Sequence, residues 1–128
     1  MLEHAYHEVK LRGKNQTKRR LVIEFEEGYD LLSVFLESEV TNFYEPIRKE
    51  LLAVLNGEKE DGAFSGNHCR LSVMGDLSIL WDDTAEDEIG NWCQLDSSDL
   101  LELVEEWKEK NDAFRQKQKE IEEKERVE

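Results

Sequence analysis

The chain has 128 residues, 38% of them apolar, and a formal net charge of −14. This length suits one domain, and so negative a chain repels nucleic acids and anionic membranes, so neither is expected as a direct partner. The longest apolar run, residues 31–36, is far shorter than the ~20 residues of a membrane span, and the polar first twenty residues predict no signal peptide, so we expect a cytoplasmic protein.

Two alternating segments open the chain. In residues 4–12 and 19–26, apolar and polar side chains alternate with a period of two, as in half-buried strands. The residues between them, 13–17, have the composition of a turn. The sequence therefore predicts an N-terminal β-hairpin whose second strand faces inward with Leu21, Ile23 and Phe25.

The next segment, residues 28–44, fits neither period cleanly. Asp30 could cap a short helix, whereas Val40–Tyr44 is more typical of extended chain, and both alternatives stay open. Pro46 is more informative because proline suits the first turn of a helix. Apolar residues at helical spacing follow it as far as Asn56–Gly57, a C-terminal stop signal. We expect a helix over about residues 46–56.

A second hairpin follows a polar connection at residues 58–62. Alternating residues 69–74 and 77–81 flank Gly75–Asp76, a two-residue turn of the kind that hairpins prefer. Residues 82–88 are too charged for a core and predict a loop, and residues 89–95 alternate again as a further strand. Two cysteines occupy apolar positions of these strands, so we expect reduced, buried thiols at Cys69 and Cys93.

A helix then begins at Asp96, the predicted N-cap. Asp99 stands where a capping box places an acid, and Leu95 and Leu100 have the spacing of a hydrophobic staple. Apolar residues continue at helical spacing to Trp107. Beyond it, fourteen of residues 108–128 are charged, which predicts a solvated helix stabilised by pairs at i,i+4.

These elements predict an α+β fold. We expect an antiparallel sheet of about five strands, made of two hairpins plus one strand, with an inserted helix and a long C-terminal helix. Residues 1–107 should form a single α+β domain and residues 108–128 a charged helical extension.

Catalytic and metal-binding patterns were sought among the acids, histidines and cysteines. An EF-hand needs Gly at position six, but counting from Asp82 that position is Asp87. A zinc site assembled from His68, Cys69, Cys93 and His4 or His7 conflicts with strand geometry, because neighbouring residues point to opposite faces. We therefore predict no catalytic residue, metal ligand or cofactor, and a small metal-assisted enzyme that uses the acids remains the alternative.

Charge distribution carries the functional argument. Between Arg70 and Lys108 there are eleven acids and no base, a pattern that favours docking of a basic protein. Trp92 directly follows the acidic loop and predicts an exposed anchor for a partner, although packing under a helix is the other interpretation. The predicted partner-binding residues are Asp82, Asp83, Glu86, Asp87, Glu88, Trp92, Asp99, Glu102, Glu105 and Glu106.

Residues 57–107 carry a family resemblance. The matching features are Gly66-Asn67-His68-Cys69, the Gly75–Asp76 turn, Trp92-Cys93-Gln94-Leu95 and the segment from Leu100 to Trp107. Together they resemble small bacterial cytosolic proteins of the immunity-protein type, which neutralise secreted toxins, often nucleases. The resemblance implies an inhibitor of a basic, nuclease-like toxin, while a regulatory protein with no toxin partner stays open.

Overall fold

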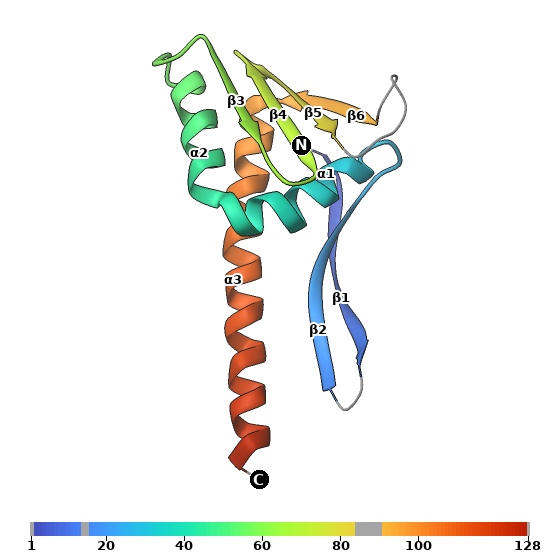
Figure 1. Cartoon of the computed structure of the whole chain (residues 1–128). Coiled ribbons are helices and arrows are strands. Elements are labelled where there is room, and N and C mark those ends of the chain that lie inside the picture. Colours follow the sequence, from blue (N-terminus) through green and yellow to red (C-terminus); the bar gives the residue numbers. More distant parts are fainter. Residues whose placement is uncertain (1, 14–15, 84–90, 128) are drawn as a thin grey trace.

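The computed structural model describes residues 2–13, 16–83 and 91–127. Its fold is α+β, as predicted, with six strands in two antiparallel sheets of order β1-β2 and β3-β4-β5-β6. Figure 1 shows the β1–β2 hairpin and the lower half of α3 extending in the same direction from the part that holds the other elements. The elements are β1 (His4–Gly13), β2 (Gln16–Phe25), α1 (Asp30–Val34), the π-helix η1 (Phe35–Val40), α2 (Thr41–Leu55), β3 (Asp61–Ser65), β4 (Cys69–Met74), β5 (Leu77–Asp82), β6 (Trp92–Asp96) and α3 (Ser97–Val127).

The predicted hairpins and the further strand are confirmed. Strand β1 pairs with β2, and β4 pairs with β5 across Gly75, whose φ of 60° gives the turn its left-handed conformation. The inward residues of β2 are Leu21, Ile23 and Phe25, as expected. Strand β3 was not predicted because its sequence, DGAFS, lacks β-branched residues.

The ambiguous segment is helical, so the expectation of extended chain at Val40–Tyr44 is wrong. Only Phe43 departs from helical geometry there, with φ −132° and ψ 38°, and it kinks α2 three residues before Pro46. Asp30 is the first residue of α1 and does not cap it. The end of α2 follows the prediction, because Gly57 has a φ of 78° and the Glu58 amide donates to the Ala53 carbonyl at 2.8 Å.

Residues 28–44 contain a π-helix, and a buried acid with a nearby exposed valine, Glu39 and Val34, obscures their helical period. A π-turn contains more residues than an α-turn, and it places Phe35, Leu36, Glu39 and Val40 all in the interior. A 3.6-residue period also places these four positions on one face, but the charged Glu39 among them interrupts the apolar pattern. Four of the six residues of η1 are therefore buried.

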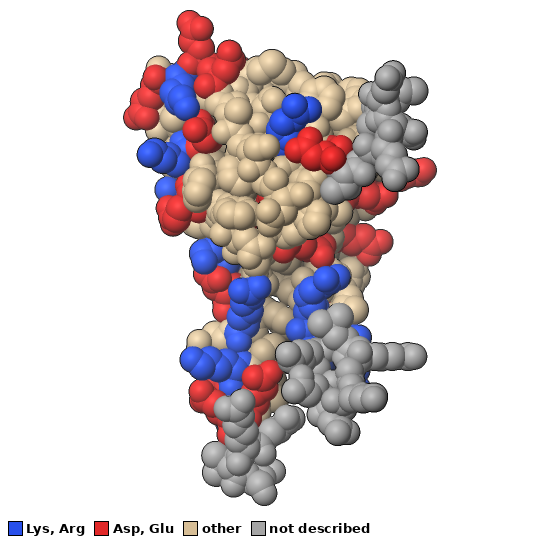
Figure 2. All heavy atoms as spheres, viewed as in Figure 1, with Lys and Arg blue, Asp and Glu red and all other residues tan. Residues whose placement is uncertain are grey.

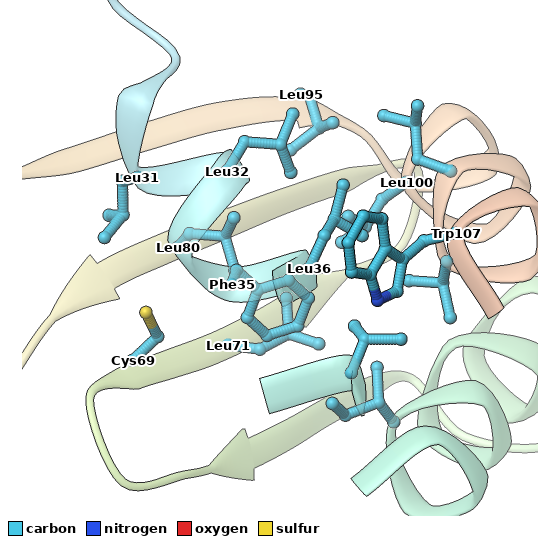
Figure 3. Close-up of a cluster of buried hydrophobic side chains, with 14 of the residues drawn as sticks. Leu31, Leu32, Phe35, Leu36, Cys69, Leu71, Leu80, Leu95, Leu100 and Trp107 are labelled. Atoms are coloured by element: carbon cyan, nitrogen blue, oxygen red, sulfur yellow. The ribbon is translucent and has the colours of Figure 1, made fainter. Parts of the chain in front are cut away.

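The core lies between these helices, the inner face of the four-stranded sheet and α3. Figure 3 shows Phe35 and Leu36 beside Leu71, Leu80 and Trp107. Burying one such side chain contributes about 1.5–3 kcal/mol. The Trp107 indole N–H donates to the Thr41 hydroxyl at 3.0 Å, so its polar atom is paired as well.

Both cysteines are free and buried, as predicted. Burial raises the pKa of Cys69 to about 12 and that of Cys93 to about 11. Both thiols are therefore protonated at neutral pH, which makes them side chains of the core and poor nucleophiles.

Helix α3 begins as its sequence predicts. A carboxylate oxygen of Asp96 accepts hydrogen bonds from the amide and the hydroxyl of Ser98, at 2.9 and 2.6 Å. These donors hold the pKa of Asp96 below its usual range. The helix continues unbroken to Val127; Phe114 is buried, whereas Ile121 is exposed.

Candidate partner-binding surface

Trp92 lies on the solvent-facing side of the four-stranded sheet. It pairs across the strands with Trp81, the two ring centroids lie 6.2 Å apart, and 48% of Trp92 is exposed. Its neighbour Cys93 points into the core. The predicted opposite orientation of these two residues is confirmed, and the interpretation that buries Trp92 under a helix is wrong.

Asp82 and Asp83 lie at the same end of the sheet. The Asp82 amide donates to the Asn91 carbonyl, and the Asp83 amide donates to the His68 carbonyl, each at 2.9 Å. The Asp83 carboxylate lies 3.7 Å from Arg70. We call Asp82, Asp83 and Trp92 the sheet-end group. The predicted site residues Glu86, Asp87 and Glu88 lie outside the described residues.

Glu39 positions this end of the sheet, although nothing in the sequence analysis identified it. Its carboxylate is almost fully buried and accepts the amides of Asn67 and His68 at 3.0–3.1 Å. Glycine at position 66 leaves room for that carboxylate, because a Cβ there would overlap it. The signal available in the sequence was the place of Glu39, an acid set between apolar residues of a helix. These hydrogen bonds, which we call the Glu39 clamp, fix the β3–β4 turn beside Asp83.

The other predicted site residues form a second group on α3, namely Asp99, Glu102, Glu105 and Glu106. Glu105 accepts a hydrogen bond from Arg48 at 3.2 Å, and Glu106 contacts the His4 ring at 2.9 Å. This α3 group begins at the far end of β6, because Leu77 pairs with Asp96 whereas Trp81 pairs with Trp92. Four residues of strand separate the two ends by about 13 Å.

A cleft of about 710 Å³ opens between β2, the α1–η1 helices and α3. Its apolar floor includes Leu21 and Phe114, and its rim carries both arginine and acidic side chains, with Arg20 lying 3.9 Å from Glu37. Burial raises the pKa of Glu37, although the Ile23 amide and Arg20 oppose the shift. Charges of both signs give this cleft no preference for an anion or a cation.

Within the described residues there is no group of three or more His, Cys, Asp or Glu arranged to hold a metal ion. Cys69 is buried and His68 exposed, while His4 and His7 contact Glu106 and Glu24. Across the same described residues, no helix combines the length and apolar character of a membrane span.

Comparison with known proteins identifies a relative over most of the chain. A Bacillus cereus protein named "Immunity protein" is 32% identical over 106 residues, which cover 82% of this chain and 91% of that protein. No protein-family model and no solved structure matches the chain. The alignment spans far more than residues 57–107, which carried the resemblance seen in the sequence. The chain belongs to the immunity-protein family.

Proposed function

We propose that this chain is a non-enzymatic inhibitor that binds a bacterial toxin and blocks it. The observation that carries the proposal is its similarity, over 82% of its length, to a Bacillus cereus protein named as an immunity protein. A stable complex needs no catalytic group on the inhibitor. Its requirement is a surface that matches the toxin in shape and charge.

We further propose that the toxin is basic, as a nuclease-like enzyme would be, and that acids recognise it. A net charge of −14 supports this, as does the exposed Trp92 beside Asp82 and Asp83. Complementary charges raise association rates, and salt screens exposed charges over about 8 Å at physiological ionic strength. Binding should therefore weaken as salt rises.

The test begins with a search for a toxin-like reading frame next to this gene. Its product, induced in a bacterial host, should arrest growth, and co-expression of this chain should restore it. The purified pair should elute as one complex. Growth arrest without rescue, together with separate elution of the two proteins, would contradict the proposed function.

Charge reversal then tests the acidic surface. The triple variant Asp83→Lys, Glu86→Lys, Glu88→Lys should bind an inactivated form of that toxin at least about tenfold more weakly. The control, Glu120→Lys, Glu122→Lys, Glu123→Lys, makes the same change in charge on the exposed end of α3. Equal affinities for the two variants at low salt would remove the acidic loop from the interface.

A further inference from the structure

We propose that the toxin docks on the open face of the four-stranded sheet. This inference rests on the proposed immunity function and specifies where the partner binds. Helices α1, α2 and α3 contact strands of this sheet, and its inward residues, such as Leu71 and Leu80, are buried. Outward residues of the same strands alternate with them and are exposed or half-buried.

Exposed apolar side chains lie in two outward rows of this face, on either side of a central row formed by Ser72, Ile79 and Gln94. In one row, strand register brings Met74 beside Leu77. In another row it places Trp81 between Arg70 and Trp92, and the half-buried Ile79 lies in the row between these two. Of the six large apolar residues exposed in the described chain, three lie here: Met74, Leu77 and Trp92. Aromatic residues in such a position are the usual anchors of protein interfaces.

The border of the face is acidic. Asp61 and Asp96 end the row that contains Met74 and Leu77, and Asp83 lies at the opposite end of the sheet. In Figure 2 the upper surface is mostly uncharged, apart from one basic and acidic pair within it, and charged side chains of both signs lie along its edge. The one base on the outward rows, Arg70, stacks over Trp81 at 5.6 Å and lies near Asp83.

This combination selects one kind of occupant, a protein with an apolar patch bordered by lysine and arginine. A second copy of the chain would instead bring two acidic borders together, each on a molecule of charge −14, and like charges across an interface are unfavourable. The acidic border therefore favours the basic toxin over self-association.

The size of the face is consistent with that role. Four strands at about 4.8 Å spacing and six residues at about 3.4 Å each span roughly 300–400 Å². A standard interface buries about 800 Å² on each partner. The sheet would supply the apolar contacts, and the acidic border would supply the remaining contacts.

Two substitutions of similar exposure test the inference. Leu77 is 37% exposed on the sheet and Ile121 is 39% exposed on the distant part of α3. By calorimetric titration with the inactivated toxin encoded beside this gene, Leu77→Asp should weaken binding at least about tenfold, as should Trp92→Ala, and Ile121→Asp should change it less than about threefold. Thermal melting of each variant verifies that it folds.

A footprint on the unmodified chain provides an independent measurement. Met74 is 46% exposed, so peroxide should convert it to the sulfoxide in the free protein. The complex should slow that oxidation at least about fivefold, because docking on the sheet covers the sulfur.

The outcomes separate the two proposals. Unchanged affinity of Leu77→Asp and Trp92→Ala, with Met74 oxidised equally fast in the complex, would overturn docking on the sheet while leaving the immunity function intact. A dimer of the free chain that Leu77→Asp dissociates would overturn it in favour of a second copy. If the unmodified chain forms no complex with the toxin, both proposals fail.

Discussion

Replacing Glu39 by alanine should destabilise the fold by about 2–3 kcal/mol. The carboxylate is 1% exposed and accepts the amides of Asn67 and His68. Leaving a buried donor unpaired costs about 1–3 kcal/mol, so two donors set a range of about 2–6 kcal/mol. Both of those residues are exposed, and water can therefore reach the freed amides and move the cost to the lower end. Removing a buried charge offsets a further part.

A double-mutant cycle makes this prediction specific. The nearest atoms to a Cβ at Gly66 all belong to Glu39, and the backbone there has no positive φ that would itself require glycine. Gly66→Ala should therefore cost about 1–3 kcal/mol in the parent protein through overlap with the carboxylate. In the Glu39→Ala background most of that cost should vanish, because the overlapping group is gone.

Urea unfolding followed by far-UV circular dichroism measures all four proteins of the cycle. Glu24→Ala is the control, since that glutamate forms only an exposed pair with His7, and it should stay within about 0.5 kcal/mol of the parent. The reasoning fails if Glu39→Ala unfolds like this control, or if the two substitutions are additive.

Three further outcomes are expected. Asp96→Ala should lower the melting temperature at neutral pH. Hydrogen bonds lower the pKa of Asp96 in the folded protein, so the carboxylate stabilises the fold above its unfolded pKa. The difference in melting temperature between the variant and the parent in calorimetric scans should therefore shrink as the pH falls. Glu37→Gln should be more stable than the parent, because burial opposes ionisation of Glu37. The difference should grow as the pH rises through the raised pKa of Glu37, and melting at a series of pH values tests this. Cys69 and Cys93 should react only slowly at mildly alkaline pH with a thiol-reactive aromatic disulfide that releases a yellow product, because their pKa values are raised to about 12 and 11. Adding urea should make both react, and rapid reaction of the folded protein would contradict the prediction.

Local pattern was sufficient for the parts of the fold that have one buried face. Both hairpins followed from alternation and turn residues, and the start of α3 followed from the Asp96 cap. Strand β3 was missed because its partner β4 determines its conformation more than its own sequence does. Helix η1 was missed because one residue of its buried face is an acid, Glu39, which interrupts the apolar pattern of the sequence.

The candidate site likewise has features that local sequence pattern predicts and features that only the tertiary structure shows. Alternation alone predicted that Trp92 and Cys93 lie on opposite faces of the strand, and burial agrees. It did not decide whether Trp92 meets solvent or packs under a helix. The clamp between Glu39 and the β3–β4 turn joins residues 28 positions apart, and no local rule predicts such a pair. The open apolar face likewise becomes visible only once register sets Met74 beside Leu77.

Counting charges along the chain cannot show which acids remain available to a partner. Glu105 and Glu106 contribute two negative charges to that count, yet each lies beside a group from another element, Arg48 and His4. Exposed ion pairs add little stability, about 0–1 kcal/mol, but they reduce the local field that a basic protein meets. On α3 this reduction falls on half of the four predicted acids. On the sheet, Asp83 is likewise paired with Arg70. Asp61 and Asp96, however, end the row that holds the exposed Met74 and Leu77, so acids and exposed apolar side chains lie side by side there. This proximity is the physical reason for placing the toxin on the sheet.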